Sequence, residues 1–196
     1  MFILYAIPAG ILAGLLLGGR LEGLGRLQFR WAWVFMLGLA VQLVLFSDQV
    51  TAWIGEAGMP IYVLSTVAVA AAVGANARVT GIPIVLAGAV SNLAAIVANG
   101  GYMPASAEAI AALGRPVKEG YSNSSFVAEP ALPWLTDIFA LPSWLPFTNV
   151  FSIGDVLIGL GVVVVIAAAM RTPAPATVAP GNSPAPDPAT PGSATA

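Results

Sequence analysis

Polar side chains that could do chemistry are few in this sequence, and most of them stand inside or beside long apolar stretches. The chain has no histidine and no cysteine. It therefore lacks the commonest general acid–base, the usual zinc ligands and any thiolate. The remaining candidates are amides and one carboxylate: Gln42, Asn92, Asn99, Asn149 and Asp155. We treat these five residues as a candidate binding site, called the polar cluster, and expect no catalytic residue, metal site or cofactor.

Asp155 has two interpretations. Ser152 and Asp155 stand in the spacing S-x-x-D at the start of an apolar stretch. This spacing is typical of a capping box, in which the hydroxyl and the carboxylate satisfy free N–H groups at a helix start. Asp155 is also the only acid inside a predicted apolar helix, which keeps a functional role open.

Asn92 and Asn99 lie seven residues apart in another apolar stretch, with Gly88 one turn before Asn92. This spacing predicts that all three share one helix face. Polar side chains within a membrane turn toward the interior of a helix bundle. Hydrogen bonds between helices are one interpretation, and the lining of a binding cavity is the other.

The elements that must position these residues are apolar helices. Of all residues, 58% are hydrophobic and 8% are charged, whereas about a quarter of a soluble domain is charged. Five stretches of about 17–19 residues are each long enough to cross the hydrocarbon core. We expect an all-α integral membrane protein with five transmembrane helices, at about 2–19, 31–47, 60–76, 82–98 and 152–170.

Five of the seven Lys and Arg residues fall in connections that share one side of such a bundle: Arg20, Arg26, Arg30, Arg78 and Arg171. The positive-inside rule then places the N-terminus outside and the C-terminus in the cytoplasm. This orientation gathers the polar cluster in the outer half of the membrane. A net charge near −2 excludes a nucleic-acid binder, which needs a basic surface.

Two segments lie outside the predicted spans, which form a membrane domain over residues 1–171. The connection 99–151 is expected to be a long extracytoplasmic loop with short interfacial helices. Its apolar, proline-broken part, 130–148, could be a lid, an interfacial anchor or a partner surface. Residues 172–196 hold seven prolines and one charged residue. We expect a disordered cytoplasmic tail there.

Three glycines recur every fourth residue in the first stretch: Gly10, Gly14 and Gly18. Such a pattern predicts a face on which another helix backbone can approach closely. Packing within the bundle is the first interpretation. Contact with a second copy or with another membrane protein is the alternative, and the lipid bilayer itself is the remaining partner.

Two short motifs resemble those of a known family. Asn99-Gly100-Gly101-Tyr102-Met103-Pro104 is similar to an NGGxMP signature, and Ser152-Ile153-Gly154-Asp155 to an SIGD signature. Residues 132–139, LPWLTDIF, lie between them and also fit, as do Gln42 and residues 18–21. The chain thus resembles the bacterial multi-pass membrane family called domain of unknown function 5317, over about residues 1–170. The resemblance implies the bacterial inner membrane and no particular activity.

Three functions remain open. We favour a non-catalytic subunit, scaffold or assembly partner of a membrane complex, because the chain is small and lacks catalytic groups. A carrier or binder of a small solute or lipid is the second, and an intramembrane enzyme using carboxylates is the third. Convergence of Asn92, Asn99 and Asp155 on one cavity would favour the binder. Polar groups that form hydrogen bonds only with one another would favour the non-catalytic subunit, scaffold or assembly partner.

Overall fold

The structure, a computed structural model, describes residues 2–113, 124–126 and 129–172. The predicted tail lies outside the described residues, apart from Thr172. Part of the long loop, 114–123 and 127–128, lies outside them as well.

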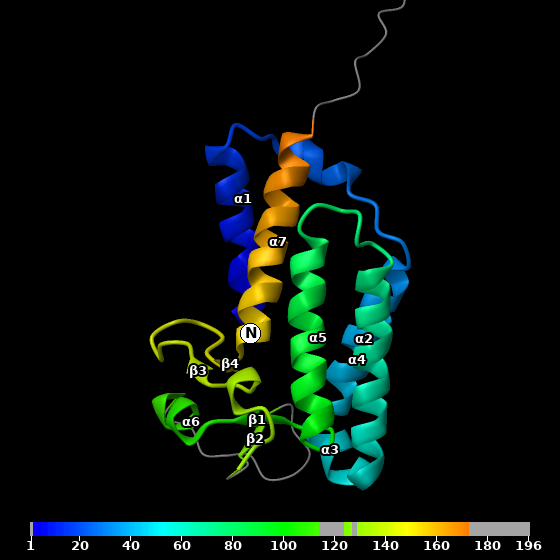
Figure 1. The fold of residues 1–196 in the computed structure, drawn as a ribbon, viewed down its shortest axis with the longest axis vertical. Helices are drawn as coiled ribbons and strands as arrows, with labels where there is room; N and C mark the ends of the chain where they lie inside the picture. The colour runs from blue at the N-terminus through cyan, green and yellow to red at the C-terminus, as the bar shows by residue number, and fades with distance from the viewer. Residues whose placement is uncertain (1, 114–123, 127–128, 173–196) are drawn as a thin grey trace, which may run out of the picture.

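Helices dominate the described chain (Figure 1). The longer helices are α1 (Ala6–Leu16), α2 (Ala32–Leu45), α4 (Gly58–Gly74), α5 (Ile82–Ala98) and α7 (Ile153–Arg171). The short helices are α3 (Asp48–Ile54) and α6 (Ala107–Leu113), with 3-10 turns at Phe2–Tyr5, Leu21–Arg26, Gly55–Ala57 and Pro133–Leu135. The strands are β1 (Met103–Ala105), β2 (Ser124–Phe126), β3 (Phe139–Ala140) and β4 (Val150–Phe151).

The five longer helices lie side by side in the order α1, α7, α5, α4, α2 (Figure 1). Helices α1 and α7 run parallel, whereas α5 runs antiparallel to both α7 and α4. All five arginines of the predicted inner side lie at one end of this bundle. The long connection from α5 to α7 lies at the other, called here the loop end.

The mostly helical fold is confirmed, and each of the five predicted stretches forms a helix. Among the described residues, one helix is both long and apolar enough to cross a membrane by length and composition, namely α7. The other four are apolar but have at most 17 residues. The predicted span 82–98 matches α5, whereas the predicted spans 2–19 and 31–47 extend too far because turns end the helices earlier. Trp31, for example, has a left-handed φ of 58°, so α2 begins only at Ala32.

The predicted loop helices exist as α6 and the 3-10 turn at 133–135, but the loop also contains β-structure that the sequence did not predict. Strand β1 pairs with β2 in parallel, and β3 pairs antiparallel with β4. These strands have only two or three residues. Segments this short carry no alternation of apolar and polar residues from which a strand could be recognised.

Glycines hold α7 close to both of its neighbours. A Cβ on Gly10 would lie 2.9 Å from the Ile166 Cβ, and one on Gly14 would meet the Met170 side chain. These two glycines therefore pack against α7 of the same chain. Gly18 does not belong to this face, because α1 ends at Leu16 and Gly18 adopts a φ of 77° in the following turn.

The contact between α5 and α7 is closer still. A Cβ on Gly161 would lie 2.7 Å from the Val85 backbone nitrogen and 2.9 Å from the Gly81 carbonyl oxygen. Two turns nearer the start of α7, Gly88 faces Gly154 in the same way. The two backbones touch at both places, which brings polar groups at the start of α7 within reach of α5.

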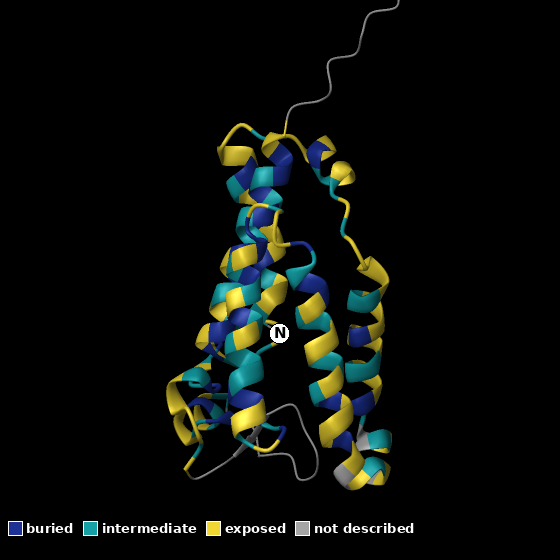
Figure 2. Ribbon diagram, turned by 45° about the vertical axis from the view of Figure 1, so that its right-hand side comes forward, coloured by how far each residue is buried: buried dark blue, intermediate teal, exposed yellow. Residues whose placement is uncertain are grey.

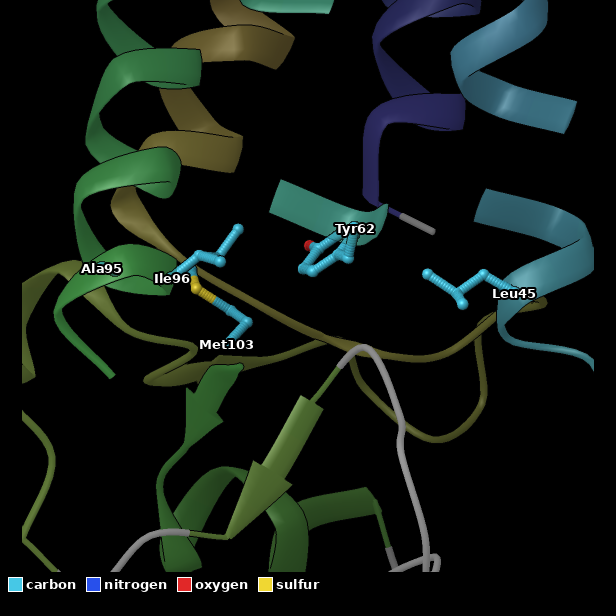
Figure 3. Close-up of a cluster of buried hydrophobic side chains, with 5 residues drawn as sticks. All are labelled: Leu45, Tyr62, Ala95, Ile96 and Met103. Atoms are coloured by element: carbon cyan, nitrogen blue, oxygen red, sulfur yellow. The ribbon is translucent and has the colours of Figure 1, made fainter. Parts of the chain in front are cut away.

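Buried and exposed residues divide each helix into an inner and an outer face (Figure 2). Many outward-facing residues are large and apolar, including Leu16, Met36, Leu64 and Leu160. At the loop end, a buried cluster joins α2, α4, α5 and β1 (Figure 3). Its members are Leu45, Tyr62, Ala95, Ile96 and Met103.

Candidate functional site

A cavity of about 280 Å³ lies inside the loop-end half of the bundle. Helices α2, α4, α5 and α7 contribute to its wall, together with the 3-10 turn at 2–5 and the long loop. Its apolar wall includes Phe2, Val69, Ala89 and Ile158. Its polar lining consists of Gln42, Tyr62, Thr66, Asn92, Asp137, Asn149 and Asp155. Tyr62, Ile96 and Met103 of the buried cluster also belong to the wall.

Asn92, Ser152 and Asp155 form a connected hydrogen-bond network at this wall. The Asn92 Nδ2 donates to the Asp155 Oδ1 at 2.8 Å, and the Ser152 hydroxyl donates to the Asn92 Oδ1 at 2.8 Å. The second oxygen of Asp155 accepts from the Ser152 backbone N–H at 3.1 Å, and the Asp155 N–H donates to the Ser152 hydroxyl at 3.0 Å. Each side chain of the network therefore bonds to both of the others or to their backbones.

The local sequence explains this arrangement. Ser152 has extended backbone angles and caps α7, so the capping box expected from the S-x-x-D spacing is present. Gly154 and Gly88 have no side chains between α7 and α5, so Asn92 reaches the first turn of α7. The box is thus extended by an amide from a second helix.

Four members of the polar cluster meet at the cavity: Gln42, Asn92, Asn149 and Asp155. The Gln42 Nε2 donates to the Ser65 hydroxyl at 3.5 Å, a long bond between α2 and α4. The Asn149 Nδ2 donates to the Val150 carbonyl at 2.7 Å. The sequence thus predicted that these four residues gather, and left open whether they line a cavity or only form hydrogen bonds between helices.

Asn99 does not line the cavity with the other four. Its Nδ2 donates to the Ala131 carbonyl at 2.9 Å, and its Oδ1 accepts from the Ala131 N–H at 2.8 Å. Helix α5 ends at Ala98, so Asn99 has left the helical face on which the seven-residue spacing depends. Asn99 therefore fixes the long loop to the end of α5.

Asp137 is the lining residue whose position was least visible in the sequence. It is 4% exposed, and the loop places it by backbone hydrogen bonds. Its N–H donates to the Pro104 carbonyl at 2.9 Å, and its carbonyl accepts from the Ser106 N–H at 3.0 Å. Its signals in the sequence were its place within the motif at residues 132–139 and its carboxyl group, which an intramembrane enzyme could use.

The segment 130–148 has two distinct sides. Its Asp137 faces the cavity, whereas Trp134, Trp144 and Phe147 are strongly exposed. The Tyr5 hydroxyl donates to the Pro146 carbonyl, which ties the segment to the N-terminal turn.

Charge is distributed unevenly along the bundle. Among the described residues, no group of three or more acidic side chains is placed to hold a metal ion. At the end opposite the loop, Arg20 pairs with Glu22 at 3.5 Å. A backbone hydrogen bond and the Arg20 charge lower the pKa of the exposed Glu22 carboxyl. Asp137 and Asp155 are the charged residues at the cavity.

A model described as a family of unknown function, DUF5317, matches residues 26–167. The matched range contains both motifs and every residue of the cavity wall except Phe2 and Ile3. No curated protein and no solved structure matches the chain.

Proposed function

We propose that this chain, which belongs to the family of unknown function DUF5317, is a non-catalytic protein of the bacterial inner membrane that binds a small solute or lipid group. The cavity between α2, α4, α5 and α7 is the observation that carries the proposal. Its volume of about 280 Å³ is close to the lower end of known ligand pockets, which suits a small ligand. A mostly apolar wall with a few convergent polar groups is also typical of such pockets.

The membrane location is supported by the exposed aromatic residues. All five tryptophans of the chain are between 50% and 86% exposed: Trp31, Trp33, Trp53, Trp134 and Trp144. They lie near the two ends of the bundle, as do the aromatic belts of membrane proteins. The outer faces of the helices also carry many large, apolar and exposed residues, as a surface in contact with lipid does.

Five spans in the predicted orientation remain part of the proposal. Helices α1, α2, α4 and α5 have 11, 14, 17 and 17 residues, and so are about 17–26 Å long at 1.5 Å per residue. They are shorter than an average hydrocarbon core, and membranes accommodate such helices by thinning locally. The N-terminus would lie outside, the C-terminus in the cytoplasm and the cavity in the outer half.

The network of Asn92, Ser152 and Asp155 favours a second function. These groups satisfy one another, as the interior of a purely structural bundle requires. On that ground the chain could instead be a subunit, scaffold or assembly partner of a membrane complex. Asn99 does not reach the cavity, so the convergence that would favour the binder holds for Asn92 and Asp155 only. We place the binder first because Gln42, Asp137 and Asn149 also meet at the cavity.

The proposal that the chain binds a small ligand is tested by a substitution that fills the cavity with a larger side chain. Ala89 lines it, whereas Ala87 lies two residues earlier on α5 and is exposed. Wild type, Ala89→Leu and Ala87→Leu are purified from native membrane in mild detergent, and the small molecules that accompany them are compared by mass spectrometry. We expect a compound that accompanies wild type and Ala87→Leu but is at least tenfold depleted in Ala89→Leu.

The same preparations separate the two functions. If no compound distinguishes Ala89→Leu from the other two proteins, and all three melt alike, the binder is contradicted. A protein retained in fixed proportion by all three preparations would then favour the subunit.

A further inference from the structure

We infer that the cavity holds part of a lipid acyl chain, which reaches it from the bilayer through the side of the bundle between α1 and α2, called here the open side. The inference rests on the proposed function and names its ligand class. It is carried by the segments that close the cavity, by the helices that border the open side and by the order of polar and apolar residues in the lining.

Packed segments close most of the cavity. Helix α5 packs on α4, and its glycines bring its backbone into contact with α7. At the loop end, Met103 and Val150 of the long connection belong to the wall and are only 4% and 8% exposed. Toward the arginine end, Val69 and Ile158 of the wall pack on a second buried cluster, formed by Val73, Ile82, Val85 and Val165.

The open side lies between the two ends of the helix row. Phe2 and Ile3 in the turn before α1 and Gln42 of α2 line the same cavity, so the row α1, α7, α5, α4, α2 curves around it (Figure 1). Among the described residues, α1 and α2 form no extended contact with each other. Ile3 belongs to the wall and is also 37% exposed. The cavity is therefore reached from the flank of the bundle, which faces lipid in a spanning protein.

The sequence outside the described residues offers little apolar material for the open side. The segment 114–123 contains Arg115, Lys118 and Glu119, and charged side chains are costly within the hydrocarbon core. The residues that follow α7 continue from the arginine end of the bundle, and seven of them are prolines. Lipid is therefore the apolar material available at the open side.

The helices that border the open side are suited to lipid rather than to a further helix. Close helix contacts in membranes use small residues. Gly10 and Gly14 of α1 already meet α7, and a Cβ on Gly38 of α2 would meet the Val69 side chain of α4. The exposed residues of α1 and α2 are mostly large and apolar, including Ile7, Leu12, Leu15, Leu16, Met36, Leu37, Leu39 and Leu43.

The lining changes from polar to apolar with depth, as a lipid does. Gln42 lies near the end of α2 and Asp155 in the first turn of α7, so both are close to the loop end. Val69 and Ala70 lie deeper, about 16–18 Å beyond the start of α4 at Gly58. The polar linkage of a lipid can thus lie beside Gln42 and Asp155, with its chain directed toward Val69.

The test uses a phospholipid that carries a diazirine in the middle of one acyl chain. The full-length chain is reconstituted in vesicles of phosphatidylethanolamine and phosphatidylglycerol that contain this lipid. Illumination attaches the lipid to residues beside it, and mass spectrometry of peptides locates the attachment. We expect labels at Ile3 on the open side, at Ile158 in the cavity wall, and at Leu160, which lies two residues further along α7 and is 51% exposed.

Filling the cavity should remove only the label inside it. In Ala89→Leu, labelling of Ile158 should fall at least about tenfold, because the larger side chain takes the place of the lipid chain in the pocket. Labelling of Leu160 should stay unchanged, since this residue faces outward. Ala87→Leu should leave both labels unchanged, because Ala87 is exposed and lies outside the wall.

A larger residue at the open side tests the entrance. Ile3→Trp should lower the labelling of Ile158 at least about tenfold, because it narrows the path from the bilayer to the pocket. Ile7→Trp is the matched change, since Ile7 is exposed but lies outside the wall, and it should have no effect. This pair keeps the inference testable if Ala89→Leu fails to fold.

The outcomes separate the lipid from the proposed function. Labelling of Leu160 without Ile158 in wild type would overturn the lipid, as would labelling of Ile158 that neither Ala89→Leu nor Ile3→Trp lowers. The binder would still stand if a water-soluble compound is depleted from Ala89→Leu in the native preparations.

Two further results would overturn the entrance alone. Labelling of Ile158 that is lost in Ala89→Leu but kept in Ile3→Trp would place a lipid in the cavity by another route. Absence of a label at Ile3 in wild type would mean that another occupant, such as a second copy of the chain, covers the open side.

Discussion

Single asparagines join parts of the chain that lie far apart in sequence. The Asn76 Nδ2 donates to the Arg30 carbonyl at 2.9 Å, and its Oδ1 accepts from the Arg30 N–H at 2.8 Å. Asn99 makes the same pair of bonds with Ala131 at the other end of the bundle. An amide side chain presents the same donor and acceptor as a peptide group. It can therefore form hydrogen bonds with both the N–H and the C=O of a residue that has no neighbouring strand to bond them.

The carboxylate of Asp155 should be only partly replaceable by an amide. Each of its oxygens accepts from a different N–H, one from Asn92 and one from Ser152. Asp155→Asn keeps one acceptor and turns a donor toward the other N–H, which should cost about 1 kcal/mol of unfolding free energy. Asp155→Ala loses both bonds and should cost about 2–3 kcal/mol. The melting temperature in detergent should therefore be highest for wild type, lower for Asp155→Asn and lowest for Asp155→Ala.

Glu22 supplies the control for this series, because it is an exposed acid at the other end of the bundle. Glu22→Gln and Glu22→Ala should both leave the melting temperature unchanged. Equal losses for Asp155→Asn and Asp155→Ala would contradict the argument from acceptor geometry, and would assign the stabilisation to the charge itself.

At the scale of elements, α7 organises the bundle, because α1 and α5 both pack on it through glycines. On the α5 side, the atoms that would meet a new side chain include backbone atoms as well as side chains. A Cβ on Gly88 would lie 2.8 Å from the Ile158 backbone nitrogen. Backbone in a packed pair of helices cannot rotate aside, so added volume must separate the helices.

Gly88→Ala should therefore lower the unfolding free energy by about 1–3 kcal/mol. The matched change is Gly74→Ala at the end of α4, where a Cβ would lie 4.0 Å from the Leu86 side chain, an ordinary contact. Helix propensity favours alanine there, so Gly74→Ala should be neutral or slightly stabilising. Thermal melting in detergent tests both, and equal melting temperatures would contradict the close α5–α7 contact.

The predictability of this fold also differs from element to element. Long apolar runs predicted the five helices, and S-x-x-D predicted the box at Ser152 and Asp155, because both signals are local. Asn99 and Gly18 were misplaced because each lies just beyond a helix end, where helical periodicity stops. The cavity required the packing of four helices and a loop that delivers Asp137, and no local pattern encodes that arrangement.

At the scale of the whole molecule, the two ends of the bundle differ in charge and in structure. One end holds all the described arginines, in short connections and at the end of α7, and the other holds the long loop and the cavity. A membrane protein with this distribution should keep its arginine end in the cytoplasm. The cavity, which lies in the loop-end half of the bundle, would then be in the outer half of the membrane.

Labelling of single cysteines can decide this orientation, because the natural chain has no cysteine of its own. Gln28 lies in the connection before α2 at the arginine end, and Ser143 lies in the long loop; both are exposed, polar and uncharged. Intact cells carrying one variant at a time are treated with a membrane-impermeant maleimide. Ser143→Cys should react at once, and Gln28→Cys only after the membrane is permeabilised, because the bilayer separates the two ends of a spanning bundle. Labelling of Gln28→Cys alone in intact cells would invert the orientation. Labelling of both variants there would mean that the bundle does not span the membrane.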